Sequence, residues 1–163
     1  MLGCCQKLLQ MEVKSMEWQI KSFAELSKEE LYEILKLRVD VFVVEQECPY
    51  PELDGKDDIA YHLIGRNNDE IIAYSRLFLP GDYFKEAAIG RVIVKEEYRE
   101  KKIGTEMLEV SVDFLIDEKG ARDIKLSAQN HLREFYGKHG FEPVSEVYLE
   151  DGIPHIDMLR KYS

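Results

Sequence analysis

The sequence predicts one α/β domain in which a mixed sheet is covered by helices on both faces. Three observations indicate this class. The β-branched run from Ile89 to Val94 is typical of a strand that is buried on both faces. A polar segment follows it, and apolar residues then recur at helical spacing from Ile103 to Phe114. Strand-like and helix-like segments alternate along the rest of the chain, whose 163 residues are enough for a domain with an apolar core.

Local signals define the first strand and the first helix. Residues 17–23 alternate enough between apolar and polar side chains to form a strand. Ser27 is followed three residues later by Glu30, which is a capping box that opens a helix. Apolar side chains recur at helical spacing until about Val44. The proline-containing segment 48–51 then ends the helix.

A hairpin and a third strand follow in the middle of the chain. Residues 59–66 and 70–79 are predicted strands, and the polar residues 67–69 form the turn between them. Pro80-Gly81 turns the chain again. The next predicted strand, 87–94, contains the β-branched run.

The last third of the chain contains two helices and three strands. One helix runs from Gly104 to Gly120, where a glycine suits the C-cap. A strand over 123–128 follows, and a short helix then runs from His131 to His139. The final predicted strands, separated by a turn at 150–152, are 142–148 and 154–160.

Composition excludes several classes of protein. The formal charge of −10 argues against a nucleic-acid partner, and no segment approaches membrane-spanning length. Three cysteines are an odd number without metal-ligand spacing, so we expect reduced thiols and no metal site. Residues 1–15 lack the features of a signal peptide and are expected to form a loose leader. We therefore expect a cytoplasmic protein with one folded domain, residues 16–163.

The start of the helix at Gly104 has the properties of a phosphate-binding site. A helix start presents unpaired N–H groups and the positive end of the helix dipole. Gly104 lets a ligand approach the backbone closely, and Arg99, Lys101 and Lys102 add positive charge. The segment is neither a Walker loop nor a dinucleotide-binding fingerprint. The alternative interpretation is a polar turn that binds no ligand.

Motifs in three regions carry a resemblance to a known family. They are Leu37 to Gln46 with Cys48-Pro49-Tyr50 and Asp54-Gly55, then Gly90 to Val94 with Arg99 to Gly104, and finally Ala128-Gln129, Phe135-Tyr136, Gly140-Phe141 and Glu150 to His155. With these motifs the chain resembles the GNAT superfamily of acyl-CoA-dependent N-acetyltransferases, and within it the ElaA-like group. The resemblance covers residue 16 to the C-terminus. It implies a single domain with a mixed, mostly antiparallel sheet and helices on both faces.

One position departs from the family pattern. The pyrophosphate loop of the superfamily resembles Gln/Arg-x-x-Gly-x-Gly/Ala. Arg99 and Gly104 match the outer positions, but Lys102 replaces the first glycine. The backbone donors survive this change, and the lysine adds charge beside the position where the backbone must approach the ligand.

The resemblance implies direct transfer of an acetyl group from acetyl-CoA, used as a co-substrate, to an amine of a small molecule or a protein, without a metal. A backbone N–H near Val92 is then the expected donor to the developing oxyanion. The residues that the resemblance assigns to the cofactor are Val92, Ile93, Val94, Arg99, Glu100, Lys101, Lys102, Ile103, Gly104, Thr105 and Gln129.

Two catalytic residues are implied. Tyr136 matches the tyrosine that acts as the general acid of the family and protonates the leaving thiolate. The alternative for Tyr136 is a core aromatic residue beside Phe135. Glu45 is the first candidate for the base that receives the amine proton, because the neighbouring Val43 and Val44 would desolvate it and raise its pKa. The alternative for Glu45 is a solvated residue at a helix end.

The acceptor is expected to contact residues around the first helix and two strands. Arg38 either binds a substrate carboxylate or pairs with Glu45. The two histidines either relay a proton or are hydrogen-bonded structural residues. The full set of candidate substrate-binding residues is Arg38, Tyr50, Asp54, His62 and His155.

Two other functions are compatible with the sequence. One is a module that binds acetyl-CoA and reports on it without turnover. The other is suggested by Arg38, Phe42 and Glu45, whose spacing also resembles that of acyl-homoserine-lactone synthases. The oligomeric state is left open for the acetyltransferase, and a homodimer is one alternative.

Overall fold

The computed structural model describes residues 16–162, and the predicted leader, residues 1–15, lies outside the described residues. The strands are β1 (Met16–Ser22), β2 (Tyr61–Asn67), β3 (Glu70–Phe78), β4 (Ala87–Val94), β5 (Asp123–Gln129), β6 (Glu142–Pro143), β7 (Tyr148–Glu150) and β8 (Ile153–Lys161). The α-helices are α1 (Lys28–Val39), α2 (Ile103–Asp113) and α3 (Arg133–Gly137).

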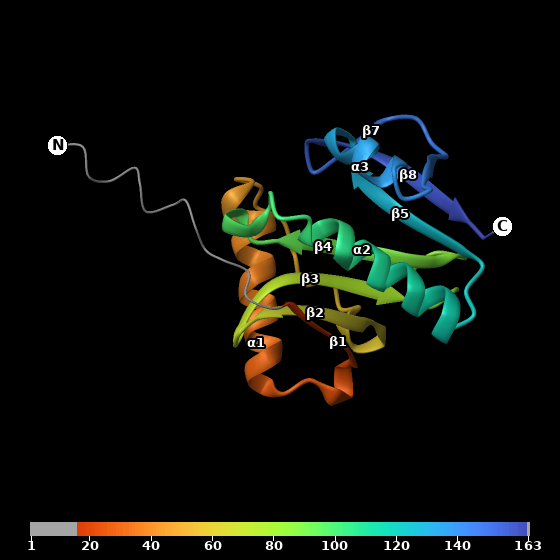
Figure 1. The fold of residues 1–163 in the computed structure, drawn as a ribbon. Helices are drawn as coiled ribbons and strands as arrows, with labels where there is room; N and C mark the ends of the chain where they lie inside the picture. The colour runs from red at the N-terminus through yellow and green to blue at the C-terminus, as the bar shows by residue number, and fades with distance from the viewer. Residues whose placement is uncertain (1–15, 163) are drawn as a thin grey trace.

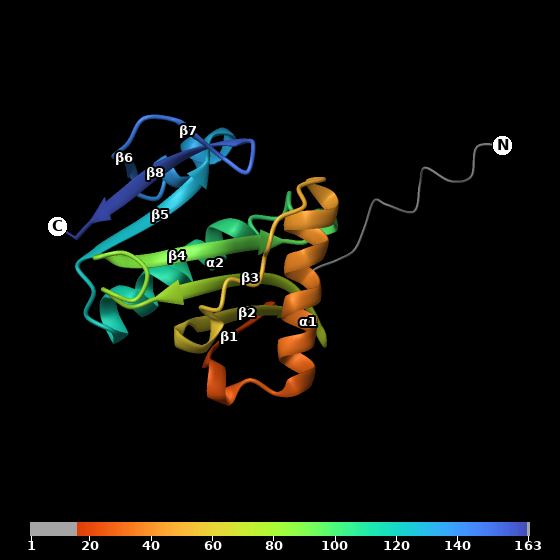
Figure 2. The ribbon, with the colours of Figure 1, turned by 180° about the vertical axis from the view of Figure 1, so that it is seen from behind.

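The strands form a mixed sheet in the order β1-β2-β3-β4-β5-β8-β6, and β7 pairs with β8. Every neighbouring pair is antiparallel except β4 and β5, which are parallel. The helix α2 crosses one face of the sheet, and α1 covers the other face (Figures 1 and 2). The prediction of a mixed, mostly antiparallel sheet with helices on both faces is confirmed.

The two faces of the sheet bury separate apolar clusters. Leu63 belongs to the larger cluster, which also includes Met107 and Leu108 of α2. The next residue of the same strand, Ile64, belongs to the cluster beneath α1 together with Ile34. This division follows from the alternation of side chains along a strand. The sheet is therefore held by packing on both faces, and β3 and β4 lie at its centre.

The first helix begins as the sequence predicts and then changes its geometry. The hydroxyl of Ser27 accepts the N–H of Glu30, and the Glu30 carboxylate accepts the N–H of Ser27, so the capping box is formed. After Val39 the chain continues as a π-helical segment, Asp40–Glu45. The predicted end near Val44 is therefore correct for the whole helical stretch. The last residue of the π-helical segment, Glu45, is connected to the end of β4 through Arg99, which binds both Glu45 and the Val94 carbonyl.

One predicted strand is wrong. Residues 142–148 do not form a single strand but separate into β6 and β7. The hydroxyl of Ser145 accepts the N–H of Asp157 on β8 at 2.9 Å, so a side chain takes the donor that a continuous ladder would use. Val144 and Val147 are about half exposed, and the intervening residues form a loop.

Candidate active site

The parallel strands β4 and β5 separate soon after they begin. Their ladder consists of two pairs, Ala87 with Ile124 and Ala88 with Lys125. Figures 1 and 2 show the two strands diverging from this point toward α3. The side of β4 that faces β5 is consequently unpaired with β5 from Ile89 onward. A sheet interior with an unpaired strand side offers backbone donors and acceptors to a bound chain.

A β-bulge determines which backbone groups of β4 point to this side. In the β3–β4 ladder Tyr74 faces Ile93 and Arg76 faces Gly90, so Ser75 lies opposite both Arg91 and Val92. Arg91 has a φ of 52°, in the left-handed region. An arginine there is uncommon, because its Cβ crowds the backbone. The bulge thus changes the direction of the peptide that follows it.

The alternation of peptide groups along β4 predicts that the peptide group of Val92 faces the diverged side. Lys95 donates its N–H to the carbonyl of Ile72 on β3 at 2.8 Å. Peptide groups of successive residues in an antiparallel ladder point alternately to opposite sides. Those of Val94 and Val92 therefore point toward β5, whereas that of Ile93 points toward β3. The Val94 carbonyl already accepts the Nε of Arg99 at 2.9 Å, so we expect a ligand to bind this edge at Val92, which is partly buried.

The helix α2 begins with uncapped amides next to this edge. Its first internal hydrogen bond runs from the N–H of Glu106 to the carbonyl of Lys102 at 3.2 Å, so the amides of Ile103, Gly104 and Thr105 precede it. No described side chain caps this start. Lys102 is the N-cap and has a φ of 59°. The lysine thus adopts the left-handed conformation for which the family pattern has glycine.

Arg99 connects the loop before α2 with the end of the first helix. Its Nη2 donates to the Glu45 carboxylate at 2.8 Å, in addition to the bond from its Nε to β4. Glu45 is itself an exposed residue, and the adjacent Val44 side chain is 65 % exposed. The expectation that neighbouring valines desolvate Glu45 is therefore wrong, because at least one of them points into solvent. Glu45 lies beside the candidate site as an exposed, ion-paired carboxylate.

The short helix α3 lies directly against the start of α2. A Cβ placed on Gly104 would lie 3.6 Å from the Phe135 ring and 3.9 Å from Val94, so β4, α2 and α3 meet at this glycine. The next residue, Tyr136, is 4 % exposed, and its ring packs edge-on against Phe135 and Phe141. Burial raises the pKa of Tyr136 further above neutral pH, so the hydroxyl is in its protonated form.

A buried ionic network lies beneath the loop that follows the first helix. Arg38 is fully buried, and it donates to the Glu52 carboxylate at 2.7 Å and to Asp57 at 2.6 Å. Arg76 on β3 is also buried and binds Asp57 and Asp54. Burial alone would raise the pKa of Asp54, but the hydrogen bonds and charge of Arg76 outweigh it and lower the pKa to about 2. Arg38 therefore pairs with Glu52 and Asp57, and the expected pairing with Glu45 is wrong.

His62 belongs to the same network. Its Nε2 lies 2.9 Å from the carbonyl of Asp57, so Nε2 carries the proton, and its Nδ1 accepts the Tyr74 hydroxyl at 2.7 Å. Burial lowers the pKa of His62, which keeps the ring neutral. Both ring nitrogens are used and the ring is fully buried, so His62 is a hydrogen-bonded structural residue. Tyr50 is half-buried and donates its hydroxyl to Glu52.

The end of β5 and the β7–β8 hairpin border the diverged strands on the other side. Gln129 donates to the side chain of Gln46 at 3.3 Å, which connects the end of β5 with the segment after the first helix. His155 on β8 donates its Nδ1 proton to the carbonyl of Ile153 at 2.7 Å, and its ring stacks on Tyr148. Gln129 and His155 thus belong to the β5–β8 part of the sheet, and none of these contacts involves Arg38.

The predicted cofactor residues differ in how much of each is accessible. Ile93 and Ile103 are buried, so only their backbone is available. Glu100, Lys101 and Lys102 are exposed on the loop before α2. Two surface hollows lie further along α2, lined by Leu108, Glu109, Val112, Asp113, Ile116, Asp117, His139, Arg160, Lys161 and Tyr162, and β4 contributes to neither. The candidate site is defined by backbone geometry along β4 and α2.

Sequence reasoning missed Arg91 and Glu52 as side chains of the site. Arg91 forms the bulge, and its Nε donates to the Glu52 carboxylate at 2.8 Å. Arginine carries no local preference for a positive φ, and Glu52 lies 39 positions away in an acidic loop. The available signal was the isolated arginine inside an otherwise apolar strand, because a charge in a central strand needs a buried partner.

Comparison with known proteins agrees with this geometry. A family model described as an acetyltransferase (GNAT) domain matches residues 19–161. The chain belongs to the GNAT acetyltransferase family. Protein ElaA of Escherichia coli (strain K12) is 45% identical over 148 residues, which are 89% of this chain and 96% of that protein. The predicted resemblance to the ElaA-like group is confirmed.

Solved structures extend the comparison to the fold of GNAT domains. The crystal structure of Escherichia coli ElaA has a TM-score of 0.84 at 43% identity and covers 90% of this chain and 100% of that one. An acyl-CoA N-acyltransferase from Pseudomonas aeruginosa has the same TM-score at 41% identity, covering 90% and 99%. The CoA-dependent acyl-homoserine lactone synthase BjaI has a TM-score of 0.75 at 15% identity, covering 91% and 84%. At that identity the likeness to BjaI shows the fold alone.

In the described residues of this GNAT domain, we find no helix that combines the length and the apolar character needed to cross a membrane.

Proposed function

We propose that this chain is an N-acetyltransferase that moves an acetyl group from acetyl-CoA directly to a primary amine of a small molecule or a protein. One observation carries the proposal. The strand side of β4 that diverges from β5 and the uncapped start of α2 lie at the same end of β4, and Phe135 of α3 lies beside Gly104 there. A cofactor that carries an anionic diphosphate and an amide-bearing arm needs this combination of groups.

Acetyl-CoA would supply an activated acyl thioester, and the residues at the start of α2 fit its diphosphate. The amides of Ile103, Gly104 and Thr105 suit the diphosphate, and Lys102 adds positive charge at the same place. Arg99 is already held by Val94 and Glu45, so we expect it to orient the loop as well as to add charge. These interactions are expected to fix the cofactor before the acceptor binds.

The acid and the oxyanion donor come from different elements. The N–H of Val92 is the donor for the oxygen that gains negative charge when the amine attacks. The hydroxyl of Tyr136 carries its proton at neutral pH, as a phenol does, so it can donate that proton to the departing sulfur. Glu45 stays the candidate that receives the proton of the amine, directly or through water. Because Glu45 is exposed, the hydrogen bond from Arg99 is the contact that would orient its carboxylate.

Incubation with acetyl-CoA and a panel of amines tests the proposal. We expect thiol release that depends on an amine, and a product whose mass is increased by one acetyl group. The alternative is a module that binds acetyl-CoA without turnover. Binding by calorimetry without thiol release for any amine would favour that alternative over catalysis.

A further inference from the structure

A buried carboxylate holds the residue that shapes the β4 bulge. Glu52 is 3 % exposed and comes from the loop after the first helix. The same carboxylate oxygen accepts the Nε of Arg91 at 2.8 Å and the Nε of Arg38 at 2.7 Å. The other oxygen accepts the hydroxyl of Tyr50. Glu52 is thus fixed by two buried contacts that do not involve β4, and it presents a rigid acceptor to Arg91.

The backbone of Arg91 needs such support. A left-handed conformation costs an ordinary L-residue roughly 1–2 kcal/mol, and strained positions persist only when surrounding contacts over-determine them. Three other groups surround the guanidinium: the carbonyl of Glu52 at 3.4 Å, the Asp54 carboxylate at 3.7 Å and the Phe42 ring at 6.0 Å. The polar contacts of the guanidinium are therefore to the loop residues Glu52 and Asp54.

We propose that Arg91 and Glu52 are positioning residues for acetyl transfer: their contact holds the bulge at its positive φ and so aims the N–H of Val92 at the thioester oxygen. The inference rests on the proposed function, because it concerns the same oxyanion donor. It assigns to Arg91 a role in backbone geometry, with no contact to the acceptor amine or the cofactor.

Glycine and alanine at position 91 separate this role from a direct one. Both substitutions remove the guanidinium and its charge. Glycine adopts a positive φ without cost, whereas alanine keeps the penalty and loses the contact that compensates for it. If the guanidinium acts through the backbone, Arg91→Gly retains the bulge and Arg91→Ala does not.

The experiment compares wild type, Arg91→Ala and Arg91→Gly in the full chain, by kinetics with an amine identified in the panel and by NMR of the Val92 amide. Loss of one oxyanion donor costs about 10²–10³ in kcat, so we expect the kcat of Arg91→Ala to be at least about tenfold below that of wild type. We expect Arg91→Gly to recover much of that loss, with the dissociation constant of acetyl-CoA unchanged in both. The chemical shift of the Val92 amide should differ between the CoA and acetyl-CoA complexes of the wild type. We expect this difference to be smaller in Arg91→Ala and to return in Arg91→Gly.

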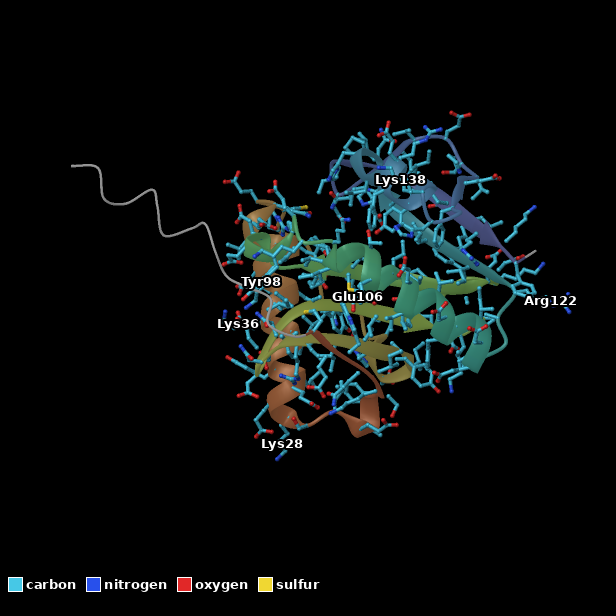
Figure 3. The ribbon with its side chains drawn as sticks, in the orientation of Figure 1. Lys28, Lys36, Tyr98, Glu106, Arg122 and Lys138 are labelled. Atoms are coloured by element: carbon cyan, nitrogen blue, oxygen red, sulfur yellow. The ribbon has the colours of Figure 1, made fainter. Side chains whose placement is uncertain are left out.

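Equal losses in the two variants would overturn the inference, because they would show that the guanidinium itself acts on a substrate. Unchanged kcat in both would overturn it as well. Failure of wild type to bind acetyl-CoA would remove the proposed function and this role with it, an outcome distinct from the other two. If Arg91→Ala does not fold, Arg91→Lys takes its place in the comparison. The inference then requires that the uncharged variant Arg91→Gly has a higher kcat than the charged variant Arg91→Lys. Arg122→Ala, exposed at the far end of the molecule, is the matched control (Figure 3).

Discussion

Replacing Lys102 tests how the start of α2 binds its ligand. Lys102 has a φ of 59° and a ψ of 15° at the N-cap, and its side chain is exposed. The left-handed conformation costs a residue with a Cβ roughly 1–2 kcal/mol, and glycine avoids this cost but loses more chain entropy on folding. We therefore expect Lys102→Gly to exceed Lys102→Ala in unfolding free energy by about 1 kcal/mol, or about 2–4 °C in midpoint temperature.

The same pair separates charge from close approach in cofactor binding. Both variants lose the lysine charge, but only glycine removes the Cβ beside the uncapped amides. If close approach of the diphosphate matters, Lys102→Gly binds acetyl-CoA more tightly than Lys102→Ala in titration calorimetry. Thermal unfolding of the free proteins gives the stability difference independently. Equal affinities would refute the reasoning about approach, and a more stable Lys102→Ala would refute the reasoning about the backbone.

Three further predictions concern the buried groups. Tyr136→Phe should lower kcat by about 10²–10⁴ while the dissociation constant of acetyl-CoA stays the same; unchanged kinetics would make Tyr136 a core aromatic residue only. Arg38→Met leaves the three carboxylates Glu52, Asp54 and Asp57 with two arginines instead of three, and this uncompensated buried charge should lower the unfolding free energy in urea by about 3–5 kcal/mol, whereas a neutral result would contradict the network. Burial opposes ionisation of Asp54, but Arg76 outweighs it and lowers the pKa to about 2. The stabilisation is therefore complete above the ordinary pKa of about 4 and lost toward pH 2, so Asp54→Asn should flatten acid unfolding in that window, and an unchanged slope would count against the pair.

Local signals allowed the elements around the site to be predicted. Ser27 and Glu30 define the start of the first helix through contacts three residues apart, and the structure contains both bonds of the capping box. The predicted strand 87–94 is β4 without change. The predicted helix at Gly104 begins one residue earlier, at Ile103. Each of these features depends on neighbours in the chain, which is why the sequence alone was sufficient.

The chemistry of the site depends on distant partners, which local patterns do not contain. The bulge at Arg91 needs a carboxylate that lies 39 positions earlier in the chain. The pairing of Arg38 with Glu45 was one expectation, but Arg38 binds the distant loop residues Glu52 and Asp57 instead. The predicted strand at 142–148 failed for a similar reason, because the Ser145 side chain competes with the ladder. Helix faces and strand alternation predict which side chains are buried, but they do not identify the partner of a buried charge.

The central claim is that the amides at the start of α2 bind the diphosphate of acetyl-CoA. An NMR titration of the isotopically labelled wild-type chain with acetyl-CoA tests it most directly. We predict that the largest shifts of backbone amides occur at residues 102–105, with a further shift at Val92. A saturating titration in which these amides do not move would contradict the claim.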